Sequence, residues 1–244
     1  LQNKPDLLLY DVLDDERLCT AGRLIWQESQ RGQHFAVGSS GVEYALTAHW
    51  RASGEIGSGR AALPSIKPVK QLLVASGSAS PMTAQQIQWA SQNGFDSIRV
   101  PTEEFIQPQT LAKARRELFE RAQKSLGSGN SVLIYSASGP DDPSIRATRE
   151  RVNSNPGAGN IAKVLGAEMG RITRDLLAQS GLRRVVIAGG DTSSYATQEL
   201  GLYGLEMLSE LTPGAPLCRG YSNDARFDGL EIALKGGQMG KADF

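Results

Sequence analysis

Short apolar runs alternate with longer stretches of helical spacing along most of the chain. Runs rich in β-branched residues, such as Ser131–Tyr135 and Arg184–Ala188, have the length and composition of strands. Ile161–Ser180 instead places its apolar residues three and four positions apart, which is the period of a helix with one buried face. Because strands joined by helices form parallel sheets, the pattern predicts an α/β fold of mainly parallel sheets with flanking helices.

The same pattern extends over the rest of the chain. We expect strands at residues 7–10, 34–37, 71–75, 97–100, 131–135 and 184–188, and helices at 16–30, 81–92, 108–126 and 161–180, with one more after residue 41. Strand 184–188 is apolar on both faces, which predicts burial on both. The last predicted strands are 205–211, 215–219 and 230–234. Turns rather than helices separate them, so we expect a mixed sheet edge near the C-terminus.

Between residues 53 and 68 this rhythm is interrupted. The stretch has no hydrophobic period and contains several glycines and prolines. We interpret residues 53–67 as a linker between two domains, 1–52 and 68–244, since strand–helix units resume after it. A long surface loop within one domain is the alternative.

The composition of the chain argues against several classes of function. The 26 Lys and Arg residues balance 26 Asp and Glu residues, so no basic surface points to nucleic acid. A hydrophobic fraction of 40% supports a folded core, and no apolar run approaches the roughly 18 residues of a membrane-spanning helix. Cys19 and Cys218 stand too far apart for a metal knuckle, and free thiols suit a reducing cytoplasmic location.

The first candidate site is the glycine- and serine-rich turn at residues 76–83, between a predicted strand and a predicted helix. Ser80 can cap that helix, and Pro81 suits its first turn. Such a turn leaves free N–H groups at the positive end of a helix, where a phosphate can approach Ser78 closely. An ordinary, well-capped turn is the alternative.

The second candidate site follows the strand 184–188. Gly189 and Gly190 permit positive φ and close approach of a ligand at the carboxyl end of a parallel strand. Asp191 can orient a hydroxyl or hold Mg²⁺ through water, and the hydroxyls of Thr192 and Ser193 can reach phosphate oxygens. The alternative is that Asp191 only caps a helix.

The third candidate site is the glycine-rich segment 235–241, Lys-Gly-Gly-Gln-Met-Gly-Lys. It has glycines at Gly236, Gly237 and Gly240 but is not a Walker loop, because one residue is missing and Ala242 replaces the hydroxyl residue. A G-x-G-x-x-G sequence after a strand is also absent, which disfavours a dinucleotide-binding enzyme.

Together these loops are more specific than each one alone. The Gly-Gly-Asp-Thr-Ser turn at 189–193, the proline turn at 212–217 and Leu-Glu-Ile-Ala-Leu-Lys-Gly-Gly-Gln-Met-Gly-Lys-Ala-Asp at 230–243 resemble the four-carbon acid sugar kinase family, formerly a family of unknown function. Segments 8–11, 37–41, 76–83 and 136–143 also match that family, so the resemblance extends from about residue 7 to the end.

Members of that family have an N-terminal domain that binds the acid sugar and a C-terminal domain that binds ATP. The resemblance implies that residues 1–52 are the end of a substrate domain and that 68–244 form the nucleotide domain. The family's opening motif, A-D-D-x-T-G, has no counterpart, since Asp14 and Asp15 are followed by Glu16 and Arg17. We therefore expect an incomplete first domain, with its acidic catalytic motif outside this chain.

The resemblance also implies the residues of the nucleotide site. They are Ser78, Gly189, Gly190, Thr192, Ser193, Gly236, Gly237 and Gly240, with Asp191 acting near the γ-phosphate and no direct metal ligand from the chain. Two departures from the family pattern, at 194–195 and at 236–239, are expected to reshape the adenine or phosphate pocket.

The expected function is ATP-dependent phosphorylation of a terminal hydroxyl of a four-carbon sugar acid, such as threonate, erythronate or 3-oxo-tetronate. Mg²⁺ would bridge the phosphates, and catalysis would depend on positioning and charge neutralisation. We expect this chain alone to bind nucleotide and to turn over poorly. We expect no nucleic-acid or membrane partner and consider a homodimer a candidate assembly. The alternatives are a non-catalytic nucleotide- or phosphosugar-binding module and another sugar-phosphate enzyme on an α/β fold.

Overall fold

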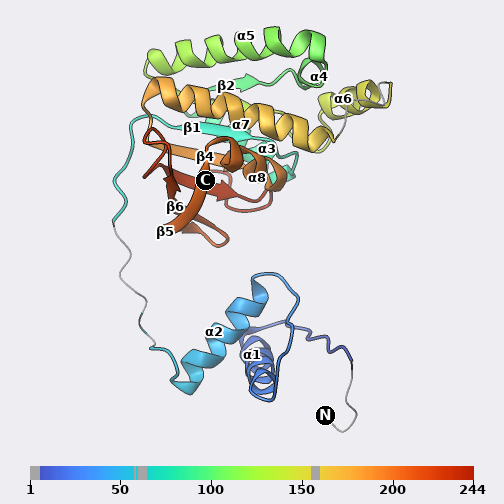
Figure 1. The fold of residues 1–244 in the computed structure, drawn as a ribbon, viewed down its shortest axis with the longest axis vertical. Helices are drawn as coiled ribbons and strands as arrows, with labels where there is room; N and C mark the ends of the chain where they lie inside the picture. The colour runs from blue at the N-terminus through green and yellow to red at the C-terminus, as the bar shows by residue number, and fades with distance from the viewer. Residues whose placement is uncertain (1–5, 58, 60–64, 155–159) are drawn as a thin grey trace. The chain divides into compact units, whose positions relative to one another are not determined.

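The computed structural model describes residues 6–57, 59, 65–154 and 160–244. The chain divides into two compact units, Leu1–Ala62 and Leu63–Phe244, which are shown in Figure 1. Residues 58 and 60–64, within the predicted linker, lie outside the described part. The predicted boundaries at 52 and 68 therefore stay a prediction.

The first unit is a pair of helices, α1 (Asp15–Ser29) and α2 (Gly41–Ser53). Helix α1 begins where it does because the Asp14 carboxylate accepts a hydrogen bond from the backbone N–H of Arg17 at 2.9 Å. The rings of Trp26 and Trp50 pack edge to face, with centroids 5.2 Å apart, and join the two helices. Both helices were predicted.

The strands predicted at 7–10 and 34–37 do not form. Both segments lack ladder pairing in the described residues, and their apolar side chains face solvent. Leu9 is 87% exposed and Val37 is 97% exposed. A strand is stable only beside a hydrogen-bonded neighbour, and the described part of this unit contains none for these segments.

The second unit is a seven-stranded sheet with helices on its faces. Its strands are β1 (Leu73–Ser76), β2 (Phe95–Arg99), β3 (Ser131–Tyr135), β4 (Arg184–Ala188), β5 (Leu202–Thr212), β6 (Ala215–Ser222) and β7 (Glu231–Lys235). Its helices are α3 (Pro81–Gln92), α4 (Thr102–Phe105), α5 (Pro108–Gly127), α6 (Pro143–Asn153), α7 (Ile161–Ser180) and α8 (Gly190–Glu199). The strand order is β2-β3-β1-β4-β7-β6-β5.

The pairing of these strands confirms the predicted α/β fold. Strands β2, β3, β1, β4 and β7 are parallel, whereas β5 and β6 pair antiparallel at the edge formed by the C-terminal part of the chain. Helix α6 was missed, because its sequence lacks an apolar stripe and follows a turn-like Asp-Asp-Pro. Its N-terminus is fixed by Asp142, whose carboxylate accepts from the N–H of Ser144 at 3.0 Å.

The main core lies between the sheet and helices α5 and α7, which run across one face of it (Figure 1). Val185 and Ile187 of β4 point into this core and are fully buried. Val186 points to the other face and is only half-buried. The prediction that strand 184–188 is buried on both faces was therefore wrong, because α3 covers the second face incompletely.

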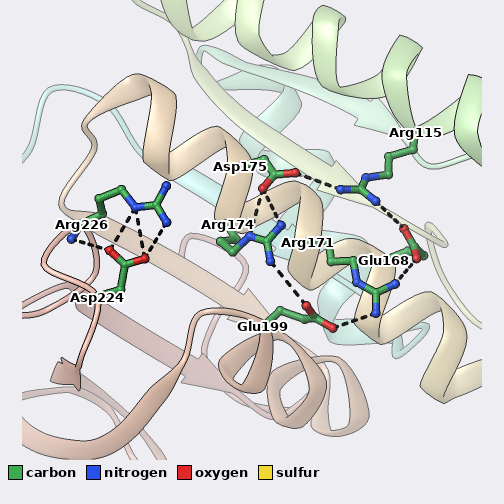
Figure 2. Close-up of polar contacts among 8 residues, drawn as sticks. All are labelled: Arg115, Glu168, Arg171, Arg174, Asp175, Glu199, Asp224 and Arg226. Atoms are coloured by element: carbon green, nitrogen blue, oxygen red, sulfur yellow. Dashed lines mark hydrogen bonds and ion pairs between the residues drawn. The ribbon is translucent and has the colours of Figure 1, made fainter.

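An ion-pair network joins α5, α7 and α8 (Figure 2). Arg115 of α5 lies 3.7 Å from Glu168 and 3.0 Å from Asp175, both on α7. Glu199, at the end of α8, lies 3.2 Å from Arg171 and 3.8 Å from Arg174 of α7. The network therefore holds α8 against α7.

None of the described helices combines the length and apolar character needed to span a bilayer.

Candidate functional site

The strand order reverses direction between β1 and β4. From β1 the chain continues to β2 and β3 on one side of the sheet, and from β4 it continues to strands on the other side. Ligands of α/β proteins bind at such a reversal, beside the carboxyl ends of the strands. The three glycine-rich loops predicted as sites follow β1, β4 and β7, which are adjacent in the sheet. The fold therefore brings all three loops together.

Backbone hydrogen bonds fix the spacing of the loops. The N–H of Gly77 donates to the carbonyl of Ala188 at 2.9 Å, and the N–H of Gly189 donates to the carbonyl of Lys235 at 2.8 Å. Gly189 has a φ of 113°, which favours glycine. Gly190 needs no such freedom, because its φ is not positive and a Cβ there would meet open space.

Hydroxyl groups join the first loop to the third. The Ser80 hydroxyl donates to the carbonyl of Gly237, and Oγ1 of Thr83 lies 2.9 Å from the same carbonyl oxygen. Ser78 Oγ accepts from the N–H of Ser80 at 3.2 Å. A Cβ on Gly237 would lie 2.5 Å from Ser78 Oγ, so this approach requires glycine. As predicted from the sequence, Ser80 caps α3, and Pro81 occupies its first turn.

Helix α8 begins at the second loop with an uncapped N-terminus. Its N-cap is Gly189, which has no side chain to accept a hydrogen bond. Asp191 is exposed in the first turn, so the alternative that it caps the helix does not hold. In the described part of the chain, the N–H groups of Gly190, Asp191 and Thr192 have no acceptor. They lie at the positive end of the helix dipole, which favours anions.

Some predicted site hydroxyls are already used within the protein. Ser193 Oγ donates to the carbonyl of Ile187 at 3.3 Å, and Ser78 Oγ supports the turn that leads into α3. The Thr192 side chain is buried against Gly77. What these loops offer a ligand is therefore mainly backbone N–H groups, including those of Ser78 and Ala79, which donate no hydrogen bond among the described residues.

The third loop is anchored to α3. The side-chain amide of Gln86 donates to the carbonyl of Met239 at 3.1 Å and to that of Lys241 at 2.7 Å. Gly240 has a φ of 81°, and a Cβ on it would lie 3.0 Å from the side chain of Phe244. Gly236 accepts a hydrogen bond from the N–H of Met239 at 3.2 Å, which closes a turn.

Sequence reasoning missed Lys235, which is the last residue of β7 and only 2% exposed. Its Nζ donates to the carbonyl of Gly236 at 2.9 Å and to that of Gly237 at 3.3 Å, and it lies 3.5 Å from Oγ1 of Thr83. Burial lowers the pKa of its ammonium group. Alternation along β7 gave no signal for this burial, because Lys235 lies on the opposite face of the strand from Ile232 and Leu234, which belong to or pack against the main core.

A second missed residue, Asp142, organises the neighbouring loop after β3. Its carboxylate accepts from the N–H of Ser138 at 2.7 Å and from the N–H of Ser144 at 3.0 Å, and it pairs with Arg99 at 2.8 Å. Burial opposes its ionisation, but the hydrogen bonds from Ser138 and Ser144 outweigh burial and hold the pKa of Asp142 well below its usual range. The N–H of Ser136 donates to β1 at 2.9 Å, so this loop borders the site.

A cavity of about 380 Å³ lies on the sheet face next to α3. Its walls are mostly apolar, with Val74, Val186 and Ile87 among them. Lys235 and Ser76 are among its polar lining residues; Ser76 is 1% exposed, and its hydroxyl has no partner among the described residues. Lys235 therefore lies between this cavity and the third loop.

Known proteins resemble most of this chain. A family model described as a nucleotide-binding C-terminal domain matches residues 73–244. Over 98% of its length, the chain is 42% identical to a Paraburkholderia graminis protein named 3-oxo-isoapionate kinase. Over 98% it is also 29% identical to a 3-oxo-tetronate kinase of Pseudomonas savastanoi pv. phaseolicola.

A solved structure shares the fold. Over 96% of the chain, a Bordetella bronchiseptica protein containing a domain of unknown function, crystallised as a domain-swapped dimer with bound citrate, superposes with a TM-score of 0.57 at 23% identity. The chain spans about half the length of each of these proteins, namely 51% of the first kinase, 50% of the second and 50% of the solved structure.

Proposed function

Because the chain belongs to the nucleotide-binding C-terminal domain family, we propose that it binds ATP and serves the ATP-dependent phosphorylation of an acid sugar. The observation that supports this most strongly is the meeting of three loops at the carboxyl ends of β1, β4 and β7. Their unpaired N–H groups form a surface that complements phosphate oxygens.

The phosphates of ATP bind across these loops in this proposal. The N–H groups of Ser78 and Ala79, those of the first turn of α8, and those of residues 237–238 supply neutral donors that need no rearrangement. Such preorganised donors suit phosphoryl transfer, in which positioning and charge neutralisation lower the barrier. The γ-phosphorus forms a bond to a hydroxyl oxygen of the acid sugar and its bond to the β–γ bridging oxygen breaks, so ADP is the leaving group and the hydroxyl proton is released to water.

Mg²⁺ bound with ATP would neutralise phosphate charge. Among the described residues, no three His, Cys, Asp or Glu side chains gather in a metal-binding arrangement. The cation would therefore be held mainly by phosphate oxygens, in keeping with the preference of Mg²⁺ for few protein ligands. Asp191 is exposed in the first turn of α8 and would hold the hydrated cation through water.

For the acceptor we propose a 3-oxo acid sugar. The relatives at 42% and 29% identity are named for 3-oxo-isoapionate and 3-oxo-tetronate, which share a 3-oxo acid framework. Of these, 3-oxo-isoapionate is the first compound to test, and threonate and erythronate follow as four-carbon acids.

The assembly of this chain into a homodimer stays a prediction.

Calorimetry with ADP and with Mg²⁺–ATP tests the nucleotide site, and a coupled assay with each acid tests phosphorylation. Micromolar nucleotide binding together with turnover of a 3-oxo acid sugar would support the whole proposal. Binding without turnover in a version extended to the length of the kinase relatives would support the alternative of a non-catalytic nucleotide-binding module. A chain that binds neither nucleotide would overturn the proposal.

A further inference from the structure

Lys235 is a buried cation without a carboxylate partner in the described part of the chain. Lysine side chains are almost never fully buried unless they are paired, because removing the ammonium group from water is costly. Here its contacts are two consecutive loop carbonyls, those of Gly236 and Gly237, and the Thr83 hydroxyl. These contacts indicate a role in the third loop that packing alone would not require.

The contacts of Lys235 determine the orientation of two peptide planes in the third loop, those that join Gly236 to Gly237 and Gly237 to Gln238. In a trans peptide the N–H points away from the carbonyl of the preceding residue, and none of the described peptides is cis. With the carbonyls of Gly236 and Gly237 turned toward Lys235, the N–H groups of Gly237 and Gln238 are turned away from it. Among the described residues, neither of these N–H groups donates a hydrogen bond.

Other donors reinforce the same orientation. The Gly237 carbonyl also accepts from the Ser80 hydroxyl and lies 2.9 Å from Oγ1 of Thr83, while the Gly236 carbonyl accepts from the N–H of Met239. Among the residues that the structure describes, Lys235 alone contacts both carbonyls and carries a charge.

We propose that Lys235 is a positioning residue of the phosphate site: its ammonium group holds the third loop with the N–H groups of Gly237 and Gln238 directed at a bound phosphate, which serves as its counter-ion across the loop. This inference rests on the proposed nucleotide function and adds a residue to it. The ammonium group does not contact the phosphate itself, because the loop lies between them.

Calorimetry with ADP and with inorganic pyrophosphate, which lacks a base and a sugar, tests this role. In Lys235→Met we expect both affinities to fall by about tenfold or more, since charge-assisted contacts are lost. Lys235→Arg should recover part of the loss. The control Lys163→Met removes one exposed positive charge from α7 and should change both affinities by less than about twofold.

If Lys235 served only to stabilise the fold, Lys235→Met would lower the melting temperature and would not specifically weaken the binding of ADP and pyrophosphate. We expect Lys235→Met to melt no lower than the wild type, because a buried unpaired charge is replaced by an apolar side chain lining a cavity. In the wild type, pyrophosphate should slow amide hydrogen exchange at residues 236–238, a measurement that needs no variant.

The outcomes separate the two proposals. If the wild type binds neither ADP nor pyrophosphate, the nucleotide function itself fails. If the wild type binds both and Lys235→Met binds them equally well, or if pyrophosphate gives no protection at residues 236–238, the nucleotide function stands and the role of Lys235 is overturned.

Discussion

The Thr192 side chain occupies the space that a methyl group on Gly77 would need: a Cβ built on Gly77 would lie 1.7 Å from Oγ1 of Thr192. This contact joins the loop after β1 to the first turn of α8. Gly77→Ala should therefore force the two loops apart, lowering the free energy of unfolding by about 1–3 kcal/mol and weakening ADP binding. Urea unfolding and calorimetry measure the two effects.

A matched control is available for this substitution. Gly127→Ala adds the same methyl group at the end of α5, where nothing lies within 4 Å, and it should leave stability and ADP binding unchanged. The cost of Gly77→Ala should shrink in a Thr192→Ala background, because the clashing oxygen is gone. Equal costs in both backgrounds would contradict the proposed contact.

Asp142 makes stability dependent on pH in a defined direction. Its pKa is held below that of the unfolded chain, so its ionised form stabilises the fold above about pH 4, and this contribution is lost as the pH falls further. At pH 7, Asp142→Asn should be less stable by about 1–3 kcal/mol. The difference from the wild type should narrow between about pH 4 and pH 2.

Urea unfolding of both proteins at several pH values measures this difference. Asp141→Asn alters an exposed neighbouring carboxylate in the same loop and should lower stability by less than about 0.5 kcal/mol at any pH. A stability difference for Asp142→Asn that stays constant down to pH 2 would show that the hydrogen bonds to Ser138 and Ser144 do not depend on its charge.

Glu168 is the buried member of the network in Figure 2, only 4% exposed and flanked by Arg115 and Arg171. Glu168→Gln removes its charge at nearly constant volume and leaves Arg115 and Arg171 with only their other partners, Asp175 at 3.0 Å and Glu199 at 3.2 Å. We expect a loss of about 1–3 kcal/mol in the free energy of unfolding.

The exposed pair between Arg146 and Glu150 provides the comparison for Glu168. Its atoms lie 3.6 Å apart one turn along α6, and Glu150→Gln should cost about 0.5 kcal/mol or less. Both values come from urea unfolding at low and at moderate salt. Similar costs for the two variants would mean that burial gives Glu168 no special weight.

Sequence patterns predicted the elements whose local signals agree with their surroundings. Helix α7 carries a long apolar stripe, and β4 is a β-branched run that ends at a glycine. The loops could be placed as well, because the carboxyl ends of parallel strands meet at one edge of a sheet. The prediction of strands at 7–10 and 34–37 was wrong, because a strand needs a hydrogen-bonded neighbour and the local sequence does not specify one.

The charged residues of the site were harder to predict. Lysine is usually exposed, so the burial of Lys235 follows only from the packing of α3 and the third loop around it. Asp142 looked like part of a turn, and three of its four donor groups do belong to the neighbouring Ser138 and Ser144. The fourth donor, Arg99 of β2, lies 43 positions away and could not be assigned from the local sequence.

Asp191 gives a prediction whose sign depends on the metal ion. Without a divalent cation, a carboxylate in the first turn of α8 repels nucleotide phosphates, whereas with Mg²⁺ it attracts the hydrated cation. Asp191→Ala should therefore weaken ADP binding by about tenfold in excess Mg²⁺ and leave it equal or tighter in EDTA. Calorimetry under both conditions measures this, with Glu120→Ala as a control of equal charge on the exposed side of α5. An equal loss under both conditions would indicate that Asp191 supports the helix, and no loss in Mg²⁺ would remove it from the site.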